Sequence, residues 1–280
     1  MATDIEFKSW DDFKINWAIE IDKIQQNEYS KIARGGSAFK RSRRLFFRGQ
    51  SSANYNLRSS FDRVMTSHGI QDFFRDRFQD YMKEFVIARS EAGLEADFSQ
   101  THSIDEGIIK DPKRLLEIAA IAQHSGLPTR LLDWSRSPYV AAFFAFIGNS
   151  PPADPHVAIW CLDWDRIRAA DSVRDSDVVF MSNQVKGNSR QVAQGGAFTL
   201  NLTKLINLED VFLKSSQFMQ TDPSAEVLFR IKIPKSERSK VLDDLSLMRI
   251  TDLTLFPDDN GVVRHMKWRL DEKEFSNSRP

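Results

Sequence analysis

Hydrophobic residues recur at three- and four-residue steps through much of the first half of the chain, and this spacing predicts amphipathic helices. Ser9 and Asp12 are typical of a helix start with an acidic first turn. The apolar face of this first helix is formed by Trp10, Phe13, Trp17, Ile21 and Ile24. Two similar faces predict a helix over about 70–90 and another that leads into Gln123; they consist of Phe74, Phe78, Tyr81, Met82 and Phe85, and of Leu115, Leu116, Ile118, Ala119 and Ala122. The polar segments 27–42 and 91–111 are interpreted as irregular.

Two continuous apolar runs predict elements that are buried on all sides. Leu45–Gln50 is short and contains a glycine near its end, which predicts a buried strand that ends in a turn. Tyr139–Phe146 is apolar all round, so we expect a deeply buried helix. Ser137 is the expected N-cap of this helix, and Pro138 its first residue.

The pattern changes after the proline-rich segment 151–155, which predicts a rigid linker or turn. Strands are then expected at His156–Leu162, Val178–Met181, Ala197–Leu202 and Val227–Ile233, followed by helices over about 235–246 and 250–256, the second capped by Thr251. The sequence therefore predicts a single mixed α+β domain, with a helix-rich N-terminal half and a β-sheet completed by C-terminal strands. We expect residues 1–42 to form an N-terminal helix and loop, and residues 43–270 the main domain.

Composition and charge add little about partners. The chain has 39 Lys and Arg residues and 39 Asp and Glu residues, and a net charge of zero does not favour nucleic-acid or membrane binding. The single cysteine, Cys161, lies in an apolar run and is expected to be a buried core thiol. No apolar run reaches the ~18–20 residues of a membrane span, and the N-terminus lacks the pattern of a signal peptide. We therefore expect a cytoplasmic protein without a membrane partner.

The segment Gln123–Trp134 gathers polar side chains around a Gly-Leu-Pro turn. Arg130 offers bidentate donors that Asp133 can hold in place, and the indole of Trp134 adds a flat apolar wall. These groups suit a polar, planar, charged ligand. His124 is the candidate for acid–base work near neutral pH. The alternative is a structural Arg–Asp pair that ties the turn down.

Two other polar segments are candidates for the same ligand. Arg48 ends a predicted buried strand, so it either binds a phosphate or carboxylate or pairs with an internal Asp such as Asp133. Gln194 can both donate to and accept from a ligand, and Gly195-Gly196 permits close backbone approach before a strand. A simple turn explains these two glycines equally well.

Together these motifs resemble the FRG domain, a family named for its Phe-Arg-Gly motif, which here is Phe47-Arg48-Gly49. The segment Gln123–Trp134, followed by Ser137-Pro138 and an apolar helix, is similar to the longest signature of the family. The third block of the family is similar to Arg190, Gln194, Gly195 and Phe198 of this chain. Its C-terminal block is similar to Leu255-Phe256-Pro257-Asp258. The resemblance covers about residues 45–265, so residues 43–270 are the expected FRG domain.

The resemblance implies an activity. FRG domains occur in bacteria and phages, often in proteins suspected of toxin or defence roles, and their block order is similar to that of ADP-ribosyltransferases. It therefore implies an ADP-ribosyltransferase-like fold and an NAD-consuming enzyme or toxin effector in a bacterial or phage conflict system, such as anti-phage defence. NAD is then the nucleotide substrate, and a protein or nucleic acid is the acceptor. The residues implied in ligand binding are Arg48, Gln50, Tyr55, Gln123, Thr129, Arg130, Trp134, Ser137, Tyr139, Arg190, Gln194 and Phe198.

The chain departs from the transferase pattern in its third block, where Gln194-Gly195-Gly196 stands in place of a Glu. Asp133 and Glu226 are the carboxylates that can replace it, so the implied catalytic residues are His124, Asp133 and Glu226. If neither carboxylate serves, the site is a non-catalytic nucleotide- or peptide-binding module, or the Arg and Asp residues only brace the fold. No metal site is expected, because the five histidines are scattered and have no ligand spacing.

Overall fold

A twisted sheet of seven strands runs through the described part of the chain in the order β1-β7-β4-β2-β3-β6-β5. The structure, a computed structural model, describes residues 2–32, 44–70, 72, 74–94, 111–148, 154–169, 177–182, 189–212, 227–259, 261–267 and 270. The strands are β1 (Thr3–Glu6), β2 (Leu45–Gln50), β3 (Leu131–Ser135), β4 (His156–Asp163), β5 (Val178–Met181), β6 (Gly196–Asn201) and β7 (Leu228–Pro234). β1 pairs with β7 in parallel, and every other pair is antiparallel. The predicted mixed α+β fold is confirmed.

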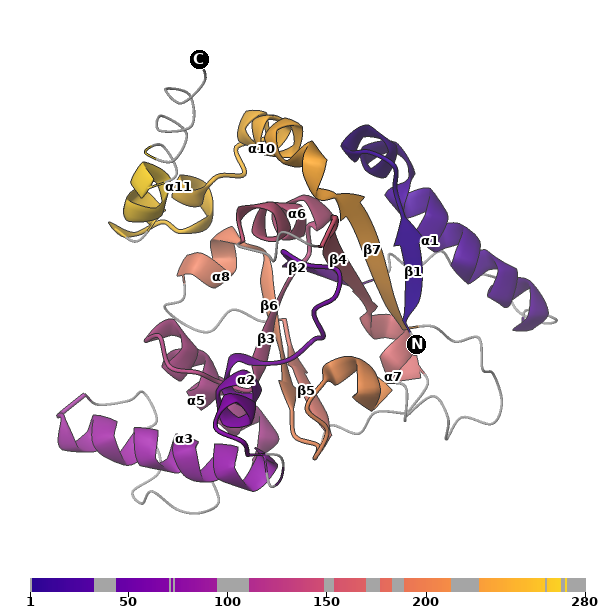
Figure 1. Ribbon diagram of the computed structural model, residues 1–280. Helices are drawn as coiled ribbons and strands as arrows, with labels where there is room; N and C mark the ends of the chain where they lie inside the picture. The colour runs from indigo at the N-terminus through magenta and orange to yellow at the C-terminus, as the bar shows by residue number, and fades with distance from the viewer. Residues whose placement is uncertain are drawn as a thin grey trace.

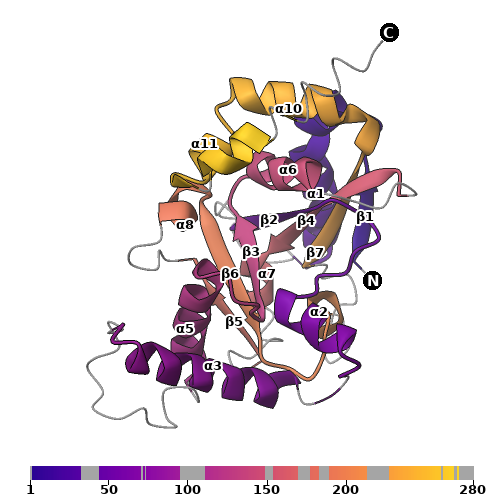
Figure 2. The same cartoon turned by 60° about the vertical axis from the view of Figure 1, so that its left-hand side comes forward.

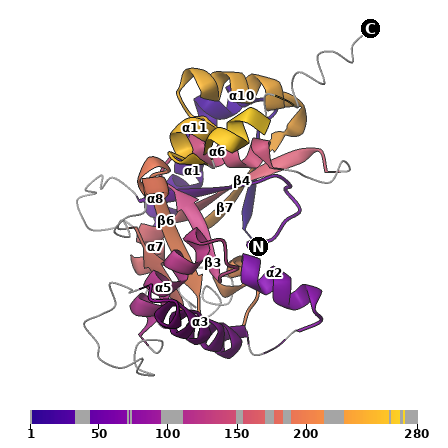
Figure 3. The ribbon, with the colours of Figure 1, turned by 90° about the vertical axis from the view of Figure 1, so that its left-hand side faces the viewer.

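The helices lie around this sheet in groups (Figure 1). They are α1 (Trp10–Ile32), α2 (Ser60–Ser67), α3 (Phe74–Glu91), α5 (Pro112–His124), α6 (Pro138–Ile147), α7 (Trp164–Ala169), α8 (Ser189–Ala193), α10 (Arg238–Leu247) and α11 (Asp252–Leu255). Figure 2 shows α6, α10 and α11 at one end of the molecule and α2 and α3 at the other, with the strands between them. The same separation is visible from the side in Figure 3.

The hydrophobic core has three parts, and the sheet divides them. α1, α6 and α10 pack on β2, β4 and β7, through residues such as Trp10, Phe47 and Phe229. A second cluster, around Trp134 and Trp160, packs on the opposite face, and α2, α3 and α5 form a third with β3, β5 and β6. The Cys161 side chain has no solvent exposure, so the predicted buried thiol is confirmed.

Most of the expected elements are present near their predicted bounds. Ser137 caps α6 by accepting a hydrogen bond from Val140 N, and Thr251 caps α11 in the same way from Thr254 N. The predicted loop over 27–42 is wrong at its start, because α1 continues to Ile32. Glu28 and Lys31 are good helix formers, so polar composition alone does not end a helix. Residues 33–42, 95–110 and 151–153 of the predicted irregular segments lie outside the described residues.

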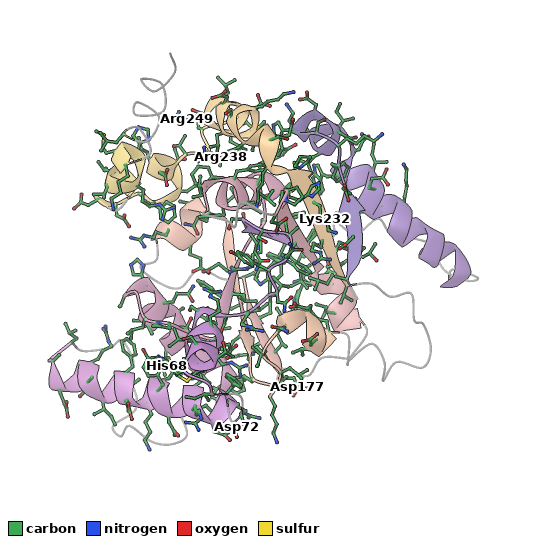
Figure 4. All side chains as sticks on the ribbon, viewed as in Figure 1. His68, Asp72, Asp177, Lys232, Arg238 and Arg249 are labelled. Atoms are coloured by element: carbon green, nitrogen blue, oxygen red, sulfur yellow. The ribbon has the colours of Figure 1, made fainter. Side chains whose placement is uncertain are left out.

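The pattern of the sequence does not indicate β1, β3, α2, α7 or α8. Each has between four and eight residues, too few to establish a clear period. In β3 the polar Asp133 also interrupts the apolar run. Ion pairs join the edge strand β1 to β7, since Asp4 pairs with Lys232 at 2.6 Å and with Arg230 at 2.7 Å. Lys232 is labelled on β7 in Figure 4.

The centre of the sheet is weakly joined between β2 and β3. They share one register pair, Phe47 with Ser135, whereas β2 and β4 share six pairs, from Leu45–Asp163 to Gln50–Ala158. α6 lies directly against Gly49 at this place. A Cβ on Gly49 would lie 2.6 Å from the backbone nitrogen of Ala145 and would also collide with the carbonyl oxygen of Ala141. The glycine of the Phe-Arg-Gly motif is therefore required by the close approach of a helix backbone.

Candidate functional site

A cavity of about 370 Å³ lies where β2 and β3 stop pairing. In Figures 1 and 2, α5, α8 and α11 follow one another along one side of β6. The cavity brings together all the sequence blocks that resemble the FRG signatures. Its walls are formed by Phe47, Arg48, Gly49, Ala120, Gln123, His124, Asp133, Trp134, Ser135, Ala141, Phe144, Arg190, Gln191, Gln194, Gly196, Ala197, Phe198 and Phe256. Eight of the residues implied by the resemblance are among them: Arg48, Gln123, His124, Asp133, Trp134, Arg190, Gln194 and Phe198.

The local structure of the segment Gln123–Trp134 explains why the last turn of α5 lies at the cavity. Gly126 has a φ of +91°, a left-handed conformation that favours glycine. Its N–H bonds to Gln123 O at 3.0 Å, and the N–H of Leu127 bonds to Ala122 O at 3.0 Å. This pair of bonds is a Schellman helix end. Pro128 then prevents the helix from resuming, so the chain turns back and enters β3 beside Gln123.

Arg48 connects the two strands where their ladder stops. Its Nη1 donates to the backbone oxygen of Asp133 at 2.9 Å and lies 3.6 Å from Oδ2 of the same residue. The Nε of Arg48 is buried and has no hydrogen-bond partner among the described residues. A buried donor without an acceptor is costly. Since Arg48 lines the cavity, its guanidinium is suited to an anionic or carbonyl-bearing ligand.

The carboxylate of Asp133 is held from the opposite side by α5. Gln123 Nε2 donates to Asp133 Oδ1 at 2.7 Å, and Thr129 Oγ1 donates to Gln123 Oε1 at 2.5 Å. Thr129 itself has no solvent exposure. Of the residues implied by the resemblance, Thr129 therefore supports the cavity wall from behind and does not line it.

Two opposing influences act on the charge of Asp133. Burial by the surrounding protein raises the pKa of the Asp133 carboxyl, while the charge of Arg48 and the hydrogen bond from Gln123 oppose that rise. The side chain keeps 55% of its surface accessible because it stands on a concave wall and faces the void. Burial likewise lowers the pKa of the Arg48 guanidinium, which Asp133 raises and the nearby charge of Arg63 lowers further.

The third block is tied to the C-terminal block by polar contacts. Arg190 Nε pairs with Asp258 Oδ2 at 2.5 Å, and Gln194 Nε2 donates to Leu255 O at 3.1 Å. The guanidinium of Arg190 also lies over the ring of Phe256, 5.7 Å from its centroid. These bonds make α8 and Phe256 one wall of the cavity.

Arg130 lies away from the cavity, in an internal ion pair. Its side chain has no solvent exposure, and its Nε lies 2.9 Å from Asp62 Oδ1. The remaining guanidinium nitrogens donate to Thr203 O and Leu205 O, both at 3.0 Å. The proposed Arg130–Asp133 pair is wrong, because Arg130, which precedes β3, pairs with Asp62 instead. A ligand reaches Arg130 only if this core opens.

The other implied ligand residues are also placed outside the cavity wall. Gln50 accepts from Trp160 Nε1 at 2.7 Å and donates to Asn56 O at 3.0 Å, so both ends of its amide are bonded within the protein. Ser137 caps α6, and the ring of Tyr139 packs edge-on against Trp10 and Phe13. Tyr55 is exposed. Glu226 lies outside the described residues.

Sequence reasoning missed several apolar members of the cavity wall, among them Phe47, Phe144 and Phe256. Each belongs to a segment that the sequence pattern assigns another role, as part of a motif or of a core helix. An apolar residue that lines a cavity has the same pattern in the sequence as one that fills a core. Ser135 is a further member, and it fixes β3 to the third block by donating to Gln194 O at 2.7 Å.

Comparison with known families agrees with this geometry. Residues 43–154 match the model of the FRG domain, so the chain contains an FRG domain. The match covers the blocks around Arg48 and Asp133, while the wall made by Arg190, Gln194 and Phe256 comes from beyond it. No curated protein and no solved structure matches the chain. In the described part of the chain, no helix is long and apolar enough to span a bilayer, and no group of three or more His, Cys, Asp or Glu side chains could hold a metal ion.

Proposed function

We propose that the cavity is the active site of an NAD-consuming enzyme of the ADP-ribosyltransferase type, with Asp133 as its carboxylate. The observation that carries this proposal is the position of Asp133 on the cavity wall, beside Arg48 and paired in register with Phe198 of the third block. In a site that only binds a nucleotide, a carboxylate can at most hydrogen-bond a ribose hydroxyl. A site that stabilises a sugar cation needs one.

The volume and lining of the cavity support a nucleotide-sized substrate. About 370 Å³ lies within the range of small-molecule sites. The rings of Phe47, Phe144 and Phe256 offer flat apolar walls for a pyridine or adenine ring. Arg48 and Arg190 supply guanidinium donors for phosphate or ribose oxygens. NAD combines all three kinds of group, and it enters here as substrate.

The reaction would use these residues as follows. The bond between the nicotinamide nitrogen and the ribose carbon breaks, and nicotinamide leaves with the electron pair. An ionised Asp133 offsets the positive charge left on the ribose. An acceptor hydroxyl, or water, then bonds to that carbon and gives up its proton, for which His124 is the candidate base on the same cavity. An acceptor on a protein or nucleic acid gives transfer, and water gives glycohydrolysis.

A second candidate, a nucleotide-binding module without turnover, is favoured by one observation. Asp133 and Arg48 already contact each other, as do Arg190 and Asp258, so the charges of the cavity are partly satisfied within the protein. In that case the ligand would occupy the cavity without losing nicotinamide.

Nicotinamide release by the purified chain separates the two candidates. The reaction is run with NAD alone and with cell lysate or total nucleic acid as acceptor, beside Arg48→Ala and beside Glu226→Gln as a test of the other carboxylate. Calorimetry measures NAD binding in parallel. Release that disappears in Arg48→Ala supports the enzyme, whereas binding without release supports the module. We propose a bacterial or phage conflict system as the setting, on the basis of the family resemblance.

A further inference from the structure

A chain of hydrogen bonds runs from the backbone of β3 to the carboxylate of Asp133. The N–H of Leu131 bonds to Thr129 Oγ1 at 3.3 Å, Thr129 Oγ1 bonds to Gln123 Oε1 at 2.5 Å, and Gln123 Nε2 bonds to Asp133 Oδ1 at 2.7 Å. The chain closes a small ring between the end of α5 and the start of β3. Neither Thr129 nor Leu131 lines the cavity.

The chemistry of its members fixes the direction of this chain. The N–H of Leu131 can only donate, so Thr129 Oγ1 accepts from it. The hydroxyl has a single hydrogen, and Gln123 Oε1, which only accepts, receives it. The amide is thereby oriented with its NH₂ group toward Asp133. The reverse orientation would place two acceptors, Gln123 Oε1 and Asp133 Oδ1, against each other at hydrogen-bond distance.

The two carboxylate oxygens of Asp133 consequently differ. Oδ1 receives the amide hydrogen of Gln123 and is occupied. Oδ2 meets the Arg48 Nη1 only at 3.6 Å, beyond hydrogen-bond length, and so retains its capacity to accept. A proton on Oδ1 would face the Gln123 NH₂ group, so the chain favours the ionised carboxylate.

We propose that Thr129 and Gln123 are positioning residues that orient the Asp133 carboxylate and keep it ionised, leaving Oδ2 for the substrate. The Asp133 side chain then has one fixed orientation, and Oδ2 is the oxygen that can accept a hydrogen bond from the substrate. The use of this orientation in catalysis rests on the proposed function, whereas the hydrogen bonds themselves exist without substrate. Other charged groups also face the site: Arg48 from β2, with Arg63 of α2 near it, His124 from α5, and Arg190 from α8.

Removing the hydroxyl of Thr129 tests the chain with a nearly unchanged side-chain shape. In Thr129→Val the amide of Gln123 is free to turn, so the Asp133 carboxyl is expected to titrate higher than in the wild type, by about half a pH unit or more. Thr129→Ser keeps the hydroxyl and is the matched control, with an unchanged titration. The measurement is ¹³C NMR of labelled Asp carboxyls across pH, with the Asp133 signal assigned by its loss in Asp133→Asn.

Gln123→Met is the second variant, because Gln123 is only partly buried and its replacement spares the core behind it. It also removes the donor to Oδ1 and should raise the titration of Asp133 in the same way. An Asp133 titration that stays at the wild-type value in a folded Thr129→Val or Gln123→Met protein overturns the proposal. This readout needs no turnover, so it stands or falls separately from NAD consumption. Where turnover occurs, both variants should lower kcat with little change in KM.

Discussion

Arg48 Nη1 donates to the backbone oxygen of Asp133 at 2.9 Å, across the point where β2 and β3 stop pairing. One side chain thereby replaces part of a missing ladder and places a guanidinium beside the carboxylate on the cavity wall. The two alternatives for Arg48, an anion-binding residue or an internal partner of Asp133, are therefore not exclusive. The residue bonds to Asp133 through one nitrogen and keeps another without a partner among the described residues.

Replacement of Arg48 by Lys separates these roles. A lysine keeps the charge but lacks the planar fork, so it cannot contact the Asp133 carbonyl and a ligand together. We expect Arg48→Lys to remain folded and to bind NAD roughly tenfold more weakly, a loss of about 1.4 kcal/mol in binding free energy. Calorimetry checks this, with Arg44→Lys as control, since Arg44 pairs with Asp165 on the surface. Equal NAD affinity in the wild type and Arg48→Lys would contradict it.

The ion pair of Arg130 and Asp62 predicts a loss of stability without a direct effect on the cavity. Asp62→Ala leaves a buried guanidinium without its carboxylate, which should lower the free energy of unfolding by about 3–5 kcal/mol. Asp165→Ala breaks the exposed pair with Arg44 and should cost less than about 1 kcal/mol. Urea unfolding measures both. If Arg130 instead served the ligand, Asp62→Ala would reduce NAD affinity at temperatures where the protein stays folded.

Two glycines of the FRG signatures are expected to respond differently to alanine. Gly49→Ala collides with backbone atoms of α6, so the free energy of unfolding should fall by about 3 kcal/mol or more. Gly126→Ala meets no atom within 4 Å and suffers only from its left-handed backbone, which costs about 1–2 kcal/mol. Thermal unfolding compares them. Because the Gly49 collision involves the backbone of Ala141, adding Ala141→Gly should not rescue Gly49→Ala; rescue would show that the side chain is the obstacle.

The raised pKa of Asp133 predicts the acid side of the pH profile. Burial raises this pKa above 3.8, so the ionised form is lost, and nicotinamide release falls, at a higher pH than for an ordinary Asp. Because the folded-state pKa is the higher one, the contribution of Asp133 to stability is complete below 3.8 and is lost as pH rises through the raised value. Urea unfolding across this window should show the wild type losing stability relative to Asp133→Asn as pH rises. A constant difference between the two proteins would refute the shift.

Periodicity predicted the long elements because each exposes a face over several turns. It placed α3, α5 and α6 and the strand Leu45–Gln50 with little error. It could not find β3, because a strand of five residues with Asp133 at its centre has no clean alternation. The many polar residues of Gln123–Trp134 indicate a site, but they also obscure the pattern of the strand within this segment.

The site could be predicted in its outline but not in its pairings. The motifs predict that Arg48, Asp133 and Gln194 belong to one site, and the fold places all three on the wall of one cavity. The partner of Arg130 lies 68 residues away in a helix that the pattern did not indicate, so proximity in sequence favoured the wrong carboxylate. The role of Gly49 likewise depends on the path of α6, which no local pattern encodes.

The most direct test of the central claim compares nicotinamide release by the wild type and Asp133→Asn under saturating NAD. The amide keeps the size of the side chain and can still accept from Gln123, but it lacks the charge that a ribose cation requires. We predict that Asp133→Asn binds NAD at least as tightly as the wild type, because a charge that repels phosphate is gone, and that its kcat falls by roughly 100-fold or more, about 2.7 kcal/mol in activation free energy. Release by Asp133→Asn at the wild-type rate would contradict the assignment of Asp133 as the catalytic carboxylate.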